Sequence, residues 1–200
     1  GALVLPSTTA AQTEAFKVEI TPFAGYRMGG SFDEKDGPGS IKLKDSDAAG
    51  IIFNFKANTN GQYELLYANQ RTNADTSGFF VDDPTIDMDV ETLQFGGTYL
   101  FDGEFTRPFI AMTIGATQFD PGLPDVSSES FFSASLGGGI QVWASNRIGL
   151  RLEGRMYTTF VDSDSSIFCS SIDGAGACNI LVDSRTVTQW EAHAGLVLRF

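Results

Sequence analysis

The residues best suited to chemistry in this 200-residue chain are ionisable side chains spaced two apart in two segments. Successive side chains of a β-strand point to opposite faces, so a spacing of two keeps such groups on one face. Acids, arginines and a histidine on one face could transfer protons, line an ion pathway or balance one another's charge. The members of this predicted network are Arg151, Glu153, Arg155, Glu191 and His193.

His193 is the only histidine of the chain, which invites a catalytic interpretation. Many lipases and proteases use a histidine beside a serine or an acid. The sequence contains no Gly-x-Ser-x-Gly motif that would supply such a serine. The alternation also places His193 on the polar face of its segment, away from a lipid substrate. We therefore interpret His193 as a structural polar residue and predict no enzymatic activity.

Eight segments alternate apolar and polar residues over about ten residues or more, as strands with two different faces do. In the last segment Glu191, His193 and Arg199 share one face. The opposite face of that segment consists of Trp190, Ala192, Ala194, Leu196, Leu198 and Phe200. The eight predicted strands are residues 16–28, 48–57, 62–71, 88–101, 107–119, 130–144, 147–160 and 186–200.

The connections between these strands alternate between short and long. Three are tight turns of turn-forming residues, at 58–61, 102–104 and 145–146, and the other four are long and polar. Short periplasmic turns and long extracellular loops are typical of outer-membrane barrels. No apolar stretch reaches the roughly 18 to 20 residues of a membrane-spanning helix. The sequence therefore predicts an all-β fold, an eight-stranded antiparallel up-and-down transmembrane β-barrel.

The barrel explains why charges of both signs recur on one face of the strands. In the narrow lumen of an eight-stranded barrel, each charge needs an opposite partner to offset the cost of desolvation. Counting from the turn at 145–146 puts Arg155 near Glu191 and Glu153 near His193. We predict that the network fills and stiffens the lumen. A proton or ion pathway is the alternative.

Aromatic residues gather at both ends of the predicted strands, as amphipathic rings do where hydrocarbon meets lipid headgroups. Those near the short turns are Phe16, Phe55, Tyr63, Phe101 and Phe200. Those near the long loops are Tyr26, Phe132, Phe160 and Trp190. Ordinary core aromatics of a soluble barrel would not segregate to the two ends of nearly every strand. The two groups therefore predict two aromatic girdles.

The first eleven residues combine an apolar stretch with Thr-Ala-Ala and resemble the end of an export signal. We accordingly divide the chain into a residual signal at 1–11 and a barrel domain at 12–200. Cys169 and Cys178 lie in a segment rich in Ser, Gly and Asp, a spacing that suits a disulfide in an oxidising compartment. Metal binding by two thiols alone is the weaker interpretation.

A net charge of −12 argues against nucleic acid as a partner, because nucleic acid binds through basic surfaces. The acids are concentrated in the long connections, where solvated, self-repelling loops explain them. Alternatively, Asp45 with Asp47 or Asp82 with Asp83 could hold divalent cations that bridge to anionic lipopolysaccharide. Neither pair has the ordered spacing of a calcium-binding loop. We predict no metal and no cofactor.

Several stretches resemble one family. Residues 135–155 combine a glycine-rich strand, a short turn and a Leu-Arg-x-Glu strand. They look like the corresponding region of the small bacterial outer-membrane β-barrel proteins, the OmpA/OmpX-like group. Arg107-Pro108-Phe109 and the final Phe200 are similar to a strand opening and an assembly signal of that family. The resemblance implies that the barrel-assembly machinery reads a signal formed by Trp190, Leu196, Leu198 and Phe200.

Together these features predict an integral protein of the bacterial outer membrane with a structural or surface-interaction role. Its expected partners are membrane lipids, lipopolysaccharide, the assembly machinery and an extracellular ligand of the acidic loops. A small porin-like channel is the first alternative. A soluble lipocalin-type barrel is another, and it would need apolar residues inside a ligand cavity. An enzyme acting on lipid is the third.

Overall fold

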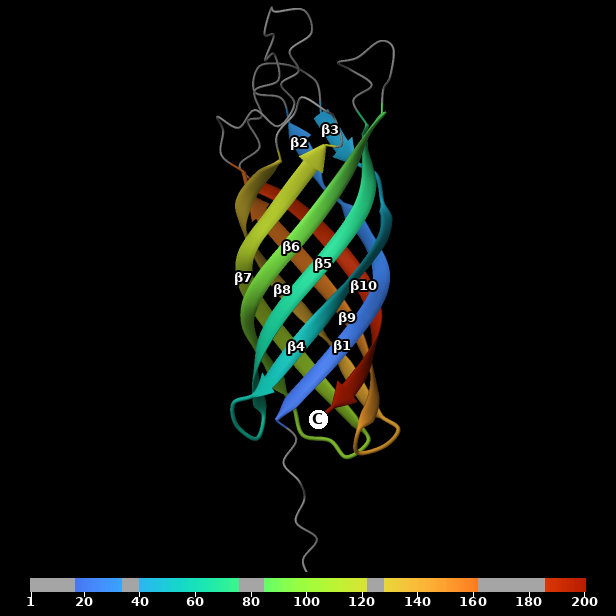
Figure 1. Cartoon of the computed structure of the whole chain (residues 1–200), viewed down its shortest axis with the longest axis vertical. Helices are drawn as coiled ribbons and strands as arrows, with labels where there is room; N and C mark the ends of the chain where they lie inside the picture. Colours follow the sequence, from blue (N-terminus) through green and yellow to red (C-terminus); the bar gives the residue numbers. More distant parts are fainter. Residues whose placement is uncertain (1–16, 34–39, 76–84, 122–127, 162–185) are drawn as a thin grey trace, which may run out of the picture.

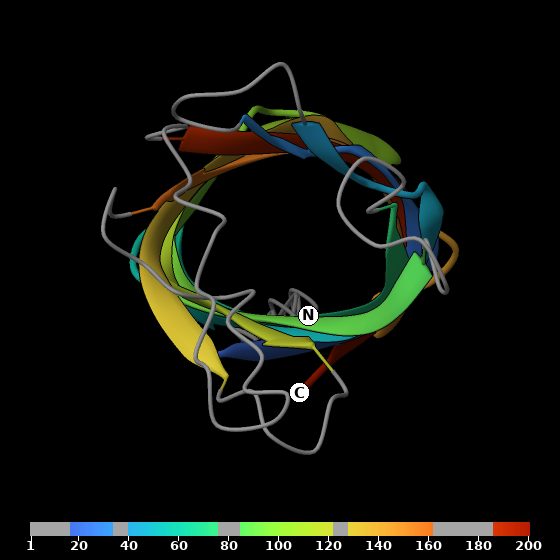
Figure 2. The same cartoon turned by 90° about the horizontal axis from the view of Figure 1, so that it is seen from above.

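The computed structural model describes residues 17–33, 40–75, 85–121, 128–161 and 186–200. Within these ranges eight long antiparallel strands form one closed barrel, and the first and last strands pair to complete the ring (Figures 1 and 2). The predicted fold is therefore confirmed. The barrel strands are β1 (Val18–Gly29), β4 (Ser46–Lys56), β5 (Gly61–Asp75), β6 (Thr85–Leu100), β7 (Thr106–Pro121), β8 (Glu129–Trp143), β9 (Ile148–Phe160) and β10 (Thr186–Arg199).

The strand register fixes the tilt of the barrel. Following paired residues once around the ring from Ile140 of β8 leads back to β8 at Ser130, ten residues away. Such a stagger tilts the strands strongly against the barrel axis, as Figure 1 shows. The residues along this path are Ile140, Leu152, Ala194, Ala24, Ala49, Asn69, Glu91, Gln118 and Ser130.

Short turns join the strands at one end of the barrel, which is the lower end in Figure 1. In the turn between β4 and β5, Asn58 Oδ1 accepts hydrogen bonds from the backbone nitrogens of Asn60 at 3.0 Å and Gly61 at 2.6 Å. In the turn between β8 and β9, Ser145 Oγ accepts from the nitrogens of Arg147 and Ile148. These side chains satisfy backbone donors that the strand ladder leaves open, as turn residues commonly do.

The first long connection differs from the predicted polar loop, because it contains two further short strands. β2 (Ser31–Asp33) and β3 (Ser40–Leu43) form an antiparallel hairpin, and β3 extends the sheet beside β5. The partners of β5 shift by one residue between Ala48↔Gln70 and Leu43↔Ala74, so that the chain bulges between β3 and β4. The hairpin lies at the upper end of the barrel (Figure 1).

The two faces of the wall have opposite character over most of the barrel. Outward side chains are large, apolar and exposed, including Phe95 at 54 % and Met112 at 64 %. Inward side chains are buried and mostly polar or charged, including Arg151 and Glu153, with apolar residues such as Ile52 and Leu66 among them. A soluble lipocalin-type barrel requires the reverse arrangement, so this alternative is wrong. Only the side of the wall that faces hydrocarbon can carry such a belt.

Near the upper end of the barrel the two faces exchange their character. On β6 the outward residues change from Leu93 below to Glu91, Asp89 and Asp87 above, while Val90 points inward. We call the upper part of the wall the collar, and the part below it the lower barrel. The collar consists of residues 69–75, 85–91, 118–121, 128–131, 161 and 186–189, together with β2 and β3.

None of the described residues forms a helix long and apolar enough to cross a membrane. Several sequence-based predictions concern residues outside the described ranges. They are the export signal at 1–11, the proposed disulfide between Cys169 and Cys178, the acidic pair Asp82 and Asp83, and the girdle residue Phe16.

Candidate functional site

The five residues of the predicted network lie on β9 and β10. Arg151, Glu153 and Arg155 alternate along β9, and Glu191 and His193 alternate along β10. All five side chains point into the lumen and are buried. The register sets Glu153 opposite His193 and Arg155 opposite Glu191.

Glu153 is the centre of the ionic contacts. Its Oε2 accepts a hydrogen bond from Arg151 Nε at 2.7 Å, and its Oε1 accepts one from Arg155 Nε at 2.7 Å. His193 Nε2 lies 3.3 Å from Oε2 of the same carboxylate. The spacing of two along β9 therefore brings one carboxylate between two guanidinium groups on a single strand.

A second carboxylate, Glu64 of β5, reaches the same arginines from another wall of the lumen. Glu64 Oε1 lies 2.6 Å from Arg155 Nη2, and Oε2 lies 3.1 Å from Arg151 Nη2. Thr98 donates a hydrogen bond to Glu64, and Asn54 Nδ2 donates one at 3.3 Å. Because β5 and β9 are not neighbours in the sheet, these bonds join strands that the backbone ladder does not connect.

Glu191 has a different set of partners. Arg27 of β1 donates to Glu191 Oε2 from Nε at 2.8 Å, and His193 Nδ1 lies 2.9 Å from Oε1. Tyr157 donates its hydroxyl proton to Oε1 at 3.2 Å. The ion pairs of Arg155 go to Glu64 and Glu153 instead of Glu191, although the backbones of Arg155 and Glu191 are paired. Counting along the sequence correctly predicts the register of β9 against β10, but it does not predict which carboxylates pair with Arg155.

Aromatic rings cover the faces of the buried cations. Arg27 lies 4.1 Å from the centroid of the Tyr157 ring, and Arg151 lies 4.1 Å from that of Phe109. The ring of His193 stacks on Phe23 at 4.3 Å. These contacts supply a partner for the flat face of each group, which hydrogen bonds in the plane leave open.

The composition of the site determines what it can do. Three arginines, Arg27, Arg151 and Arg155, face three glutamates, Glu64, Glu153 and Glu191. Of the two ring nitrogens of His193, Nδ1 lies 2.9 Å from Glu191 and Nε2 lies 3.3 Å from Glu153. Among the described residues no group of three or more His, Cys, Asp or Glu side chains could hold a metal ion. The site therefore joins strands through balanced charges.

A smaller ionic contact lies at the turn end of the lumen. Arg199 of β10 contacts Glu19 Oε1 of β1 with Nη2 at 2.6 Å and with Nε at 2.9 Å. The guanidinium carbon of Arg199 also lies 3.5 Å from the centroid of the Trp143 ring of β8. This contact joins the first and last strands of the chain below the main network.

The lumen changes from ionic to apolar toward the collar. Above Glu191 and Arg27, Gln189 Nε2 donates to Gln70 Oε1 at 3.0 Å. Above these amides most buried inward side chains are apolar, with Thr72 and Thr159 as exceptions, and the rings of Phe119 and Phe131 lie 6.1 Å apart. This apolar layer consists of Leu43, Met88, Val90, Phe119, Phe131, Val161 and Val187, all of them buried.

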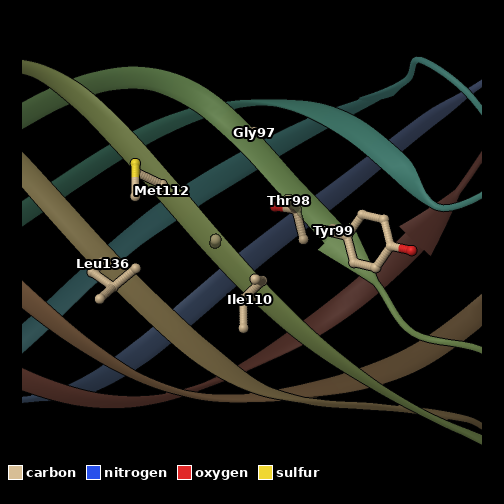
Figure 3. A pocket seen from close by; sticks show the side chains of 7 residues that line it. Gly97, Thr98, Tyr99, Ile110, Met112 and Leu136 are labelled. Carbon is tan, nitrogen blue, oxygen red and sulfur yellow. The ribbon is translucent and has the colours of Figure 1, made fainter.

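The predicted assembly signal lies on the outer wall. Trp190, Leu196 and Phe200 are exposed, whereas Leu198 is partly covered. Elsewhere on the outer wall, Gly97 leaves a hollow of about 300 Å³ between larger neighbours (Figure 3). Tyr99, Ile110, Met112 and Leu136 surround it, so the hollow is part of the apolar belt. The girdle residues near the two rims, including Tyr26 and Phe132, also face outward.

Comparison with known proteins adds the fold type. No protein-family model and no curated protein matches the chain. Among solved structures, Neisserial surface protein A is similar with a TM-score of 0.63 at 12 % identity, over 92 % of this chain and 97 % of that one. The N-terminal β-barrel domain of OprF from Pseudomonas aeruginosa is similar with a TM-score of 0.50 at 13 % identity, over the same two shares. This chain thus has the fold of the small eight-stranded outer-membrane β-barrels.

Proposed function

We propose that this protein is a sealed, non-enzymatic barrel that serves a structural or surface-interaction role in the outer membrane. The observation that carries the proposal is the filling of the lumen by two successive layers. Ion pairs cross the lumen between Glu64 on β5 and Arg151 and Arg155 on β9. The apolar layer around Phe119 lies above them. Ions entering from outside would have to cross an apolar layer and then displace paired charges, and both steps are costly.

Planar-bilayer recording tests the sealed lumen against the porin-like alternative. The full chain, refolded and inserted into planar bilayers in potassium chloride, should give no reproducible current steps above those of a protein-free bilayer. Ohmic steps whose frequency rises with the amount of folded protein would contradict the proposal. Heat-unfolded protein is the control, because it detects current caused by membrane damage instead of a folded pore.

The surroundings of His193 support a non-enzymatic role. Its two ring nitrogens face Glu153 and Glu191, and one face of its ring is covered by Phe23. A general base needs a free nitrogen within reach of a substrate proton. Replacing His193 with Gln should leave any lipase or protease activity of a purified sample unchanged. A loss of such activity with the barrel still folded would contradict the proposal.

The partners fall into two groups. Contact with membrane lipids follows from the apolar belt, whereas lipopolysaccharide, the assembly machinery and an extracellular ligand are our proposals. Cation bridging to lipopolysaccharide draws on Asp45 and Asp47 near the collar, although Asp45 Oδ1 already accepts a hydrogen bond from the Gly29 nitrogen at 3.0 Å. Calorimetric titration with millimolar calcium tests this bridging, and the absence of heat would reject it.

The assembly signal can be tested with a matched pair of aromatic variants. Phe200 and Phe105 are both exposed aromatics at the turn end of the barrel, at 66 % and 74 %. If Phe200 is read during assembly, Phe200→Ala should lower the amount of heat-modifiable barrel in the outer membrane, and Phe105→Ala should not. Equal amounts in the two variants would contradict the role of Phe200.

A further inference from the structure

The seam between the first and last strands of the barrel is interrupted. In the described residues, each of the other seven seams pairs residue by residue without a gap. Between β1 and β10 the pairing runs through Glu19↔Arg199 and Ile20↔Leu198, and resumes at Phe23↔Gly195. The two omitted positions of β1 are Thr21 and Pro22. The backbone pairing therefore has a local gap at the seam between β1 and β10, the first and last strands of the barrel.

Pro22 accounts for this gap. Val18 and Phe200 exchange both backbone hydrogen bonds, from nitrogen to oxygen at 3.3 Å and 2.9 Å. In an antiparallel pair such positions recur every second residue, so Pro22 stands where its nitrogen should donate to the Leu196 oxygen. Proline has no N–H, and the bond cannot form. At the same level the Thr21 hydroxyl is buried and has no hydrogen-bond partner among the described residues.

Ion pairs flank the gap on both sides. Below it, Arg199 binds Glu19 across the seam at 2.6 Å. Above it, Arg27 binds Glu191 across the seam at 2.7 Å. In both cases the two residues are direct partners in the strand register. Side-chain bonds thus reinforce the paired backbone on either side of the interruption.

We infer that the barrel wall opens first at the β1–β10 seam around Pro22, and that the two flanking ion pairs are latches that keep the opening local. A missing backbone bond lowers the free energy needed to separate two strands at that point. Next to the gap, Phe23 belongs to an apolar cluster with Ile52, Leu66 and Ala68. These contacts do not fix strand positions as hydrogen bonds do. The inference concerns motion of the wall and is independent of the proposed function.

Hydrogen exchange of backbone amides in lipid nanodiscs tests this inference. The β10 amides that face β9 serve as the control for those that face β1. Arg199 donates its backbone N–H to Arg147 on β9 at 2.9 Å, so the odd-numbered amides of β10 face β9 and the even-numbered ones face β1. The amide of Leu196 should therefore exchange about tenfold or more faster than those of Gly195 and Val197. All three lie at nearly the same depth in the membrane. Equal exchange rates would overturn the inference.

A proline pair gives the matched variants. Pro22→Ala supplies the missing donor and should slow exchange at Leu196 about tenfold. Pro108 is also in a barrel strand, but its pairing with Ile140 belongs to an uninterrupted seam. Pro108→Ala should leave exchange at Leu196 unchanged. No effect of Pro22→Ala, or the same effect from both variants, would overturn the inference.

The latches are tested by removing a charge without changing the size of the side chain. Glu19→Gln weakens the lower latch and should speed exchange at Leu196 and Leu198 by about tenfold, with Val197 little changed. Arg71→Gln is the control, because Arg71 and Asp89 form an exposed ion pair outside the lumen. If Glu19→Gln speeds exchange equally along both edges of β10, Glu19 stabilises the whole barrel. Its assignment as a latch of the β1–β10 seam would then be wrong.

Discussion

The lower barrel and the collar are parts of the same eight strands, and yet they are built in opposite ways. In the lower barrel Phe95 and Met112 face outward, while Glu64 and Arg155 fill the lumen. In the collar Asp89 and Asp120 face outward, and Phe119 lies inside with other apolar side chains. The collar therefore has the interior of a water-soluble protein, and the lower barrel has the interior of a membrane protein.

This difference shows where the hydrocarbon ends. A strand presents one apolar and one polar face in either surrounding, and the solvent decides which face is outside. The exchange of faces between Leu93 and Glu91 on β6 thus marks the outer boundary of the apolar belt. On β8 and β9 the change comes higher, because Phe132 and Phe160 still face outward, with their rings 5.7 Å apart. Such aromatic pairs are typical of the interface with headgroups.

The largest expected effect comes from the ionic interior of the lower barrel. Arg155→Leu leaves the buried carboxylates Glu64 and Glu153 each with one arginine fewer. We expect the free energy of unfolding, measured by urea titration in lipid vesicles, to fall by about 3 to 5 kcal/mol. Arg71→Leu, which removes an exposed arginine from the outer face, should change it by less than about 0.5 kcal/mol. A similar loss in both variants would mean that the lumen is solvated.

The apolar interior of the collar should respond to loss of volume. Phe119→Ala removes a fully buried ring, and we expect it to cost about 3 kcal/mol in the same urea titration. Phe95→Ala removes an outward ring of the lower barrel and should cost less than about 1 kcal/mol, since lipid tails replace its contacts. Should Phe95→Ala be the more costly change, the assignment of inside and outside would be reversed.

A charge introduced on the outer wall should lower the stability of the lower barrel more than that of the collar. Met112→Arg puts a charge into the apolar belt and should destabilise the barrel by about 2 kcal/mol or more. Gln118→Arg lies on the same face of the same strand within the collar, and should cost at most about 1 kcal/mol. Comparable costs at the two positions would move the boundary above Gln118.

The smallest expected effect is that of the seam. Pro22→Ala adds one backbone hydrogen bond between β1 and β10, which should raise the free energy of unfolding by about 1 kcal/mol. Pro108→Ala, in an uninterrupted seam, is the comparison and should give a smaller gain. Urea titration of both variants in one lipid composition gives the difference.

The strands of the barrel could be predicted because each one alternates over about ten residues and ends at recognisable turns. The register of β9 against β10 could also be predicted, since the strands run from fixed ends over a uniform repeat. The partners of Arg155 could not. Glu64 and Arg27 lie on the polar faces of their strands in the sequence, but contacts across a lumen depend on side-chain reach and on the stagger of the barrel.

The collar was missed for a different reason. Its outward residues Asp87, Asp89 and Glu91 lie in phase with Leu93 and Phe95 below, so the strand continues while the polarity changes. The sequence does contain the signal, because along the chain the apolar positions shift from even to odd numbers at residue 92. The hairpin of β2 and β3 was missed because a segment rich in Asp, Gly and Pro resembles an irregular loop.

A spin-label scan along the outward face of β6 tests the central claim most directly. Single cysteines at positions 89, 91, 93, 95 and 99, in a variant with Cys169 and Cys178 replaced by Ser, are labelled and compared for collision with oxygen and with a water-soluble nickel chelate. The account predicts that oxygen dominates at 93, 95 and 99 and that the chelate dominates at 89 and 91. Dominance of the chelate at 95, or of oxygen at 89, would contradict it.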